Sequence, residues 1–166
     1  QIESITWMTA DGLSAAISAF VGQNYGAKKF NRIKEVYHEG IQILGGMGII
    51  STLILIFAAE FLFSIFVPND PAAIKEGIIY LRILGLSQFF MSIEIGTTGA
   101  FNGLRKTMAP TFIGVVFNIL RIPAAIILSS TILGLSGVWW SISTSSIFKG
   151  IILYAWFKIA ITKLNQ

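Results

Sequence analysis

Apolar residues along this chain fall into five long runs that are separated by shorter polar segments. The runs cover about residues 4–21, 39–66, 76–100, 108–130 and 138–161. A helix needs about 17–25 mostly apolar residues to cross a bilayer, and each run is long enough. No stretch of the sequence has the character of a separate soluble domain. The pattern therefore predicts an all-α membrane protein in which residues 1–166 supply five transmembrane helices.

Glycine and proline indicate where these helices pack, bend and turn. The second run contains Gly45, Gly46 and Gly48, and small residues let helices approach closely in lipid. Pro123 lies inside the fourth run, where we expect a kink because proline removes a helical hydrogen bond. The segment 68–71 begins and ends with proline, which predicts a firm turn.

Lysine and arginine gather in every second connection between the runs. The residues concerned are Lys28, Lys29, Arg32 and Lys34 in the first connection, Arg105 and Lys106 in the third, and Lys158 and Lys163 near the C terminus. The second connection has Lys75 opposed by Asp70, and the fourth has no charge. Cations beside apolar spans stay on the cytoplasmic side of a membrane. We therefore expect a multi-pass protein of the cell membrane with its C terminus in the cytoplasm.

The composition narrows the possible functions. The chain is 54% hydrophobic and 12% charged, about half the charged fraction of a soluble domain. Its +4 net charge is clustered in connections, so a lipid bilayer, and no nucleic acid, is the expected partner. It has no cysteine, one histidine and no phosphate-binding loop motif. We expect no metal site, no cofactor and no enzymatic activity.

Two glycine-containing motifs follow the first and third apolar runs. The first has the pattern Gly-Gln-x-x-Gly-Ala before the basic cluster, and the second places glycine, threonine and proline around Arg105. Both resemble motifs of the multidrug and toxic compound extrusion (MATE) transporters. The matching positions are Gly22, Gln23, Gly26 and Ala27 in the first motif, with Arg32 and Lys34 after it, and Gly99, Gly103, Thr107 and Pro110 in the second. Asn102 stands where that family usually has arginine. Arg105 stands where it usually has glycine, so a left-handed backbone there would be strained.

The resemblance implies an architecture larger than this chain. The five runs are similar to helices eight to twelve of a twelve-helix transporter, most of its C-terminal half-bundle. The missing N-terminal half would then be a partner in the same protein, and the first residues, which lack a basic segment, fit the interior of a longer chain. The implied function is secondary-active efflux of small organic cations, driven by a gradient of H⁺ or Na⁺. The transport motion would be a rocking of one half against the other.

Ionisable residues within the apolar runs are candidates for an ion or substrate site. A charge inside a span costs about 2.5–3.5 kcal/mol on insertion scales, so it usually has a function. With a rise of about 1.5 Å per residue, Asp11, Arg121 and Lys149 lie near one depth, and Glu94 is somewhat closer to the cytoplasm. We expect opposite charges to pair there, with Gln88 and Asn118 nearby. The family has an acid in its tenth helix, and Glu94 is the deep acid of the corresponding run, although the motif alignment sets the family position near Met91.

Two other interpretations are open for these residues. They can hold helices together without meeting a substrate. Alternatively, Arg121 and Lys149 can make the cavity cationic, as in a flippase or exporter of lipid-linked sugars or polysaccharide from the same superfamily. A Ser/Lys intramembrane protease is not favoured, because nothing distinguishes Ser143, Ser145 or Ser146 near Lys149 as a nucleophile.

Overall fold

The computed structural model describes residues 3–66 and 71–165, and nearly all of them are helical. No strand occurs in these two ranges. The helices are α1 (Ser4–Gly26), α2 (Phe30–Phe57), α3 (Ala59–Phe66), α4 (Pro71–Gly103), α5 (Met108–Ser129) and α6 (Leu135–Thr162), followed by the short 3₁₀ helix η1 (Lys163–Asn165). The expected turn at 68–71 lies mostly outside the described ranges, and Pro71 begins α4.

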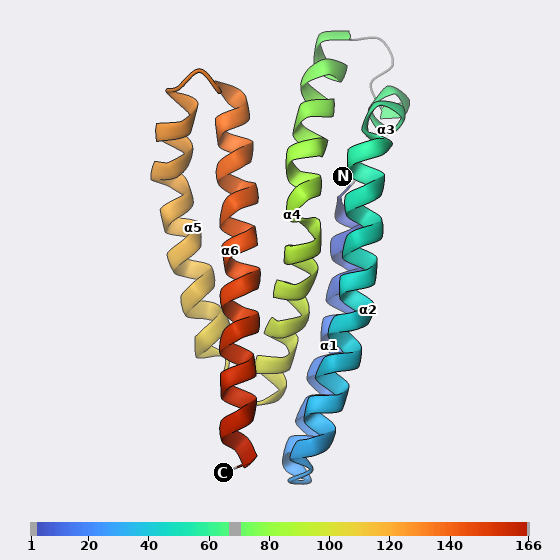
Figure 1. Cartoon of the computed structure of the whole chain (residues 1–166), viewed down its shortest axis with the longest axis vertical. Coiled ribbons are helices and arrows are strands. Elements are labelled where there is room, and N and C mark those ends of the chain that lie inside the picture. The colour runs from blue at the N-terminus through green and yellow to red at the C-terminus, as the bar shows by residue number, and fades with distance from the viewer. Residues whose placement is uncertain (1–2, 67–70, 166) are drawn as a thin grey trace.

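The long helices run side by side, with α4 in the middle (Figure 1). It packs against α1, α2 and α6, and α5 packs against α6. The α1–α2 connection, the α4–α5 connection and the C terminus lie at one end of the bundle, and the α5–α6 connection lies at the other (Figure 1). We call the end with the α1–α2 connection, the α4–α5 connection and the C terminus the basic end, because its connections carry the cations. The alternation of charged and neutral connections thus predicts correctly which connections share an end.

The helices approach closely at several of their glycines. A Cβ on Gly48 would lie 2.8 Å from the Cα of Phe89, so α2 contacts the α4 backbone there. A Cβ on Gly99 would meet the carbonyl oxygen of Ser14, which sets the distance from α4 to α1. The side chains enclosed between these helices and α6 include the fully buried Leu44 and Phe101. This packing follows from small residues, as expected for helices in lipid.

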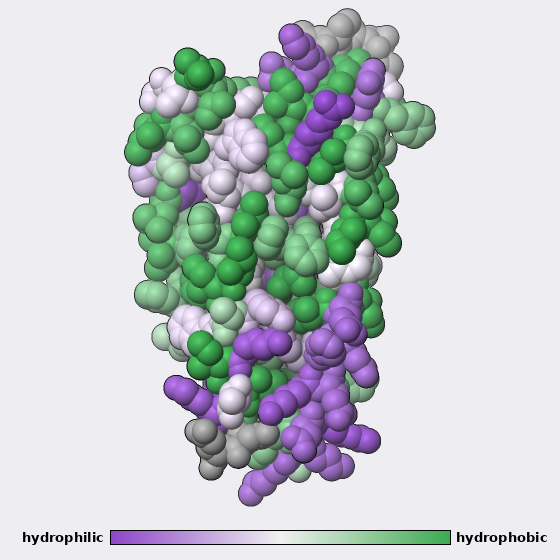
Figure 2. Space-filling view, viewed as in Figure 1, coloured by the Kyte–Doolittle hydropathy of each residue, from purple (hydrophilic) through white to green (hydrophobic). Residues whose placement is uncertain are grey.

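Lipid-facing side chains cover the long sides of the bundle. The space-filling view in Figure 2 shows hydrophobic residues over the middle of the bundle. Hydrophilic residues gather toward its ends, most densely over the start of α2. Large apolar side chains such as Ile50, Phe112, Ile122 and Ile126 are exposed. Water would disfavour so much exposed apolar surface, whereas a bilayer accommodates it.

The expected number of five spanning helices is slightly wrong. Within the described residues, four helices are long and apolar enough to cross a membrane: Phe30–Phe57, Ala73–Gly103, Met108–Ser129 and Leu135–Thr162. The 23 residues of α1 are sufficient in length, but its Ser, Thr, Asn, Gln and Asp11 make it too polar by composition. The second apolar run is also divided at Ala58 into α2 and α3. Neither glycine nor proline stands at Ala58, so the pattern gave no signal for a break.

Three expected helix boundaries are also wrong by several residues. The first helix ends at Gly26 and not at residue 21, and α2 begins at Phe30 and not at residue 39. Gly22 therefore lies inside α1. The start of α4 is five residues earlier than the apolar run that predicted it. Hydropathy detects the part of a helix that lies in lipid, whereas these helices continue through polar residues beyond it.

Two cations hold left-handed backbone conformations at the basic end. Lys28 has φ 56° and Arg105 has φ 60°. After α1, the N–H of Lys28 donates to the Tyr25 carbonyl and that of Lys29 to Asn24. The N–H groups of Arg105 and Lys106 donate in the same pattern at the end of α4. Both ends are therefore Schellman motifs in which lysine or arginine occupies the position that glycine usually takes.

Candidate functional site

The centre of the bundle contains an ion pair between α4 and α6. The Nζ of Lys149 lies 2.9 Å from Oε1 of Glu94, and the two side chains are only 11% and 18% exposed. It is the one ion pair found within residues 3–66 and 71–165. Two charges so poorly solvated depend on each other, because an isolated charge in an apolar environment is costly. The pair joins two of the expected site residues.

Arg121 of α5 lies beside this pair and is held by a serine. Its Nε and Nη2 donate to Oγ of Ser145 at 2.9 and 2.7 Å, and that hydroxyl donates onward to the Ile142 carbonyl at 3.1 Å. Arg121 is also close enough to Glu94 for electrostatic attraction. Glu94, Arg121 and Lys149 therefore form a group with one acid and two cations, which we call the charged cluster. Nothing in the sequence distinguishes Ser145 as a nucleophile, and in the structure its hydroxyl orients the Arg121 guanidinium.

Serine hydroxyl groups and a glycine fix the register of α6 against its neighbours. Oγ of Ser143 donates to the Ile83 carbonyl of α4 at 3.0 Å, and Oγ of Ser141 donates to the Arg121 carbonyl of α5 at 3.0 Å. Next to Lys149, Gly150 has no side chain, and a Cβ there would meet the carbonyl oxygen of Phe90. This close approach brings the lysine within reach of Glu94. The small and hydroxyl-bearing residues of α6 thus position the cluster.

The other three expected site residues lie apart from the charged cluster. Asp11 of α1 is exposed and forms no ion pair with a described residue, so the expected pairing at a shared depth is wrong for Asp11. Asn118 of α5 is exposed as well. Gln88 of α4 is fully buried, and neither its Nε2 nor its Oε1 has a hydrogen-bond partner among the described residues. Depth alone did not determine how each helix is rotated about its axis.

One acid was missed by reasoning from sequence. Glu3, which precedes α1, is 6% exposed, and its Oε1 has no hydrogen-bond partner among the described residues. The side chain is hydrogen-bonded to Tyr80 of α4. Its signal in the sequence is an acid directly before an apolar run, which is the usual position of a solvated charge. The burial arises because α1 begins below the far end of α4 (Figure 1).

The motif glycines bring the ends of α1 and α4 into contact. A Cβ on Gly22 would lie 3.5 Å from the Gly103 carbonyl oxygen, and one on Gly103 would lie 2.6 Å from that of Ser18. Gly26 has open space around it, and Gln23 and Ala27 are exposed. Thr107 stands directly before α5, and Pro110 is buried in its first turn. The two motifs therefore join helices toward the basic end.

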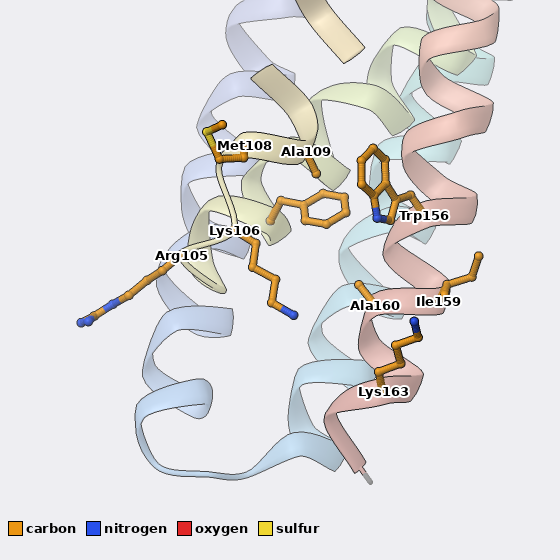
Figure 3. Close-up of a pocket in the computed structure, with 9 residues that line it drawn as sticks. Arg105, Lys106, Met108, Ala109, Trp156, Ile159, Ala160 and Lys163 are labelled. Atoms are coloured by element: carbon orange, nitrogen blue, oxygen red, sulfur yellow. The ribbon is translucent and has the colours of Figure 1, made fainter. Parts of the chain in front are cut away.

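Three cavities formed by the described residues are not lined by the cluster, and two of them bear on the expected site and the basic end. One, of about 320 Å³, lies between α2, α4 and α6 and is lined by apolar side chains that include Phe89, Phe90 and Tyr154. The other, of about 500 Å³, lies at the basic end between the α4–α5 connection and α6 (Figure 3). The first of these cavities is lined by aromatic residues of α4 and by no member of the charged cluster.

Comparisons with known proteins identify the family of the chain. A family model described as MatE matches residues 1–127. The chain is 32% identical over 161 residues to the "Probable multidrug resistance protein NorM" of Thermotoga maritima, covering 94% of this chain and 34% of that protein. It is 30% identical over 178 residues to the "Probable multidrug resistance protein YoeA" of Bacillus subtilis, covering all of this chain and 37% of that protein. The chain thus spans about a third of the length of these relatives.

Solved structures show the same fold. The inward-facing conformation of a multidrug resistance MATE family transporter of the MOP superfamily superimposes with a TM-score of 0.89 at 20% identity. The superposition covers 99% of this chain and 38% of the transporter. The family match, which extends over most of the chain, and the apolar helices make this a multi-pass membrane protein. The chain belongs to the MatE family, the multidrug and toxic compound extrusion family that its two glycine motifs resemble.

Proposed function

We propose that the complete protein exports small organic cations across the cell membrane in exchange for H⁺ or Na⁺, and that this chain supplies most of one of its two half-bundles. The family supports this proposal, as do the names of the relatives, which describe multidrug resistance proteins. Transporters with two such halves expose a site near the midplane alternately to each side by rocking one half against the other. The C terminus then lies in the cytoplasm with the other parts of the basic end.

The observation that carries the proposal is the Glu94–Lys149 pair. Its carboxylate lies within a span and already binds a cation, the lysine ammonium, at 2.9 Å. A proton, a Na⁺ ion or a cationic drug that binds Glu94 competes directly with Lys149 for the same oxygen. Binding of the coupling ion and release of substrate are thereby linked through one group. With 18% of the Glu94 side chain exposed, a small ion can reach it.

Asp11 is a second candidate for this site. An exposed carboxylate within α1 would cost about 2.5–3.5 kcal/mol if that part of the helix lay in the bilayer and faced lipid. We therefore expect Asp11 of α1 to face protein or a water-filled cavity in the complete transporter. Such a carboxylate can attract cations into the cavity. Asn118, which is also exposed on α5, can contribute hydrogen bonds to a substrate in the same space.

The charge of the cluster supports a second candidate function. Arg121 and Lys149 outnumber Glu94, so the cluster has a net charge of about +1 when all three groups are ionised. A cationic site suits the phosphate groups of lipid-linked sugars, which a flippase of the same superfamily would move. In this case Arg121 and Lys149 would bind the substrate, and Glu94 would position the lysine.

Substitutions in the full-length protein distinguish these functions. If Glu94 binds the coupling ion, the rate of cation efflux from cells that express Glu94→Gln should be at least tenfold lower than with the unsubstituted protein. The amide cannot exchange a proton or bind Na⁺ strongly. Asp11→Asn tests the second acid in parallel, with Asn118→Ala as an uncharged comparison. An ionophore that collapses the Na⁺ or H⁺ gradient should abolish efflux. Efflux that depends on ATP and survives the ionophore would refute exchange, and full activity of both acid variants would refute these sites.

A further inference from the structure

A cavity at the basic end combines cations with apolar side chains. It has a volume of about 500 Å³ and lies between the end of α4, the start of α5 and the last turns of α6 (Figure 3). Its lining consists of Phe101, Arg105, Lys106, Met108, Ala109, Trp156, Ile159, Ala160 and Lys163. We call it the basic-end pocket. It plays no part in the transport function proposed above, and none of its side chains belongs to the charged cluster.

The cations of this pocket are arranged unequally. Figure 3 shows Lys106 extending toward α6 and Lys163 turning back along α6 toward the pocket, while Arg105 extends away from it. The Schellman motif explains the difference, since Arg105 takes the left-handed position and Lys106 follows with its N–H bonded to the Phe101 carbonyl. No acid is among the lining residues. Lys106 and Lys163 therefore present two ammonium groups without a carboxylate between them.

The remaining lining is apolar, and much of it is exposed. Met108 is 79% exposed, Ile159 58% and Trp156 42%. The buried ring of Phe101 supports the indole of Trp156 edge-on, with centroids 6.4 Å apart. Tryptophan prefers the level of the lipid head groups, so the pocket lies where phosphate and acyl chain meet. A free phosphate ion would contact the lysines and leave this apolar wall unused.

We propose that the basic-end pocket binds one anionic phospholipid. Lys106 and Lys163 hold its head-group phosphate, and its acyl chain lies along Trp156, Ile159 and Met108. Basic pockets between spans on the cytoplasmic side are suited to anionic lipid head groups, and each lysine there improves binding roughly fivefold. The occupied pocket links the α4–α5 connection to the end of α6 through a molecule of the bilayer.

Fluorescence of Trp156 tests this proposal. The full-length protein, with Trp156 as its single remaining tryptophan, is placed in phosphatidylcholine vesicles that contain a few per cent of brominated lipid. Brominated phosphatidylglycerol should quench Trp156 more strongly than the same fraction of brominated phosphatidylcholine. The apparent affinity of the K106Q/K163Q variant for brominated phosphatidylglycerol should be at least tenfold lower, so that the preference over phosphatidylcholine is lost. Inorganic phosphate added to the vesicles should not relieve the quenching.

A matched variant separates a specific pocket from general surface charge. Lys29 and Arg32 are exposed at the same end but do not line the pocket, so K29Q/R32Q removes the same charge and should keep the preference. An unchanged emission maximum in pure phosphatidylcholine verifies that each variant is folded around Trp156. Equal quenching by both lipids, an equal loss in both double variants, or relief by phosphate would overturn the proposal.

Discussion

At the scale of single residues, the backbone of Arg105 is the clearest departure from what its side chain prefers. A residue with a Cβ pays roughly 1–2 kcal/mol in the left-handed region, whereas glycine does not. Arg105 adopts φ 60° at the position where the family motif usually has glycine. The sequence motif therefore anticipated the strain. Lys28 shows the same conformation after α1, where no motif glycine was expected at that position.

Arg105→Gly should stabilise the full-length protein by about 1 kcal/mol, because it removes the left-handed strain at the end of α4. Thermal unfolding in detergent measures the effect. Lys106→Gly is the control, since it removes the same charge at the next residue, which does not have a positive φ. It should be neutral or destabilising. A destabilised Arg105→Gly, or equal effects of the two substitutions, would contradict the assigned conformation.

At the scale of helices, contacts through glycine determine the spacing of α1 and α4. The sequence predicted close packing from small residues, but it could not say which glycine faces which helix. Gly99 meets the α1 backbone at Ser14, whereas Gly46 of α2 and Gly114 of α5 have open space. All are glycines within apolar runs, and only the rotation of each helix distinguishes them.

Gly99→Ala should destabilise the protein by about 1–3 kcal/mol, because the added methyl group forces α1 and α4 apart. Gly114→Ala in α5 is the matched control, since its methyl group meets no atom and alanine favours a helix. Thermal unfolding of both variants checks this. If the two have the same stability, the packing of α1 on α4 through Gly99 is wrong.

The Glu94–Lys149 pair connects α4 with α6, and its partners should be energetically coupled. Removing one partner leaves a poorly solvated charge, so Lys149→Met or Glu94→Gln alone should cost about 3 kcal/mol. The double variant should lose less than the sum of the single variants, because no isolated charge remains. A double-mutant cycle on unfolding free energies measures the coupling. Additive effects would show that the two side chains do not interact.

Helix limits at this scale were only partly predictable. The fourth run matches α5 almost residue for residue, because polar connections bound it closely on both sides. The start of α2 was missed because Arg32, Lys34 and Glu35 are polar yet continue the helix. The division at Ala58 left no mark in the sequence. Hydropathy shows which residues lie in lipid and which in water. It does not show where a helix ends, because a helix can extend beyond the lipid.

At the scale of the whole molecule, the charged connections predict how the chain is threaded through the membrane. This chain has no cysteine, so cysteines introduced one at a time can be labelled in cells once any cysteine in the rest of the full-length protein is replaced. A membrane-impermeant maleimide should label Thr131→Cys, in the α5–α6 connection, in intact cells. It should label Lys28→Cys only after permeabilisation, because we propose that the basic end faces the cytoplasm. Labelling of Lys28→Cys in intact cells, and of Thr131→Cys only after permeabilisation, would contradict the predicted orientation.

The sequence indicated which charged residues lie within the apolar runs, but it did not determine which of them are in contact. Insertion cost and depth singled out Asp11, Glu94, Arg121 and Lys149, and the structure brings the last three together. Asp11 remained apart because depth gives the level of a residue and not the side of the helix on which it lies. The burial of Glu3 was not predicted, because it depends on where α1 begins relative to α4.

Ion-coupled transport by the full-length protein is the central claim, and proteoliposomes test it most directly. Purified protein is reconstituted without ATP, and uptake of a fluorescent organic cation is followed after a pH or Na⁺ gradient is imposed. The account predicts uptake that requires one of these gradients and falls at least tenfold in Glu94→Gln. Uptake at the same rate without either gradient, or an unimpaired Glu94→Gln variant, would contradict it.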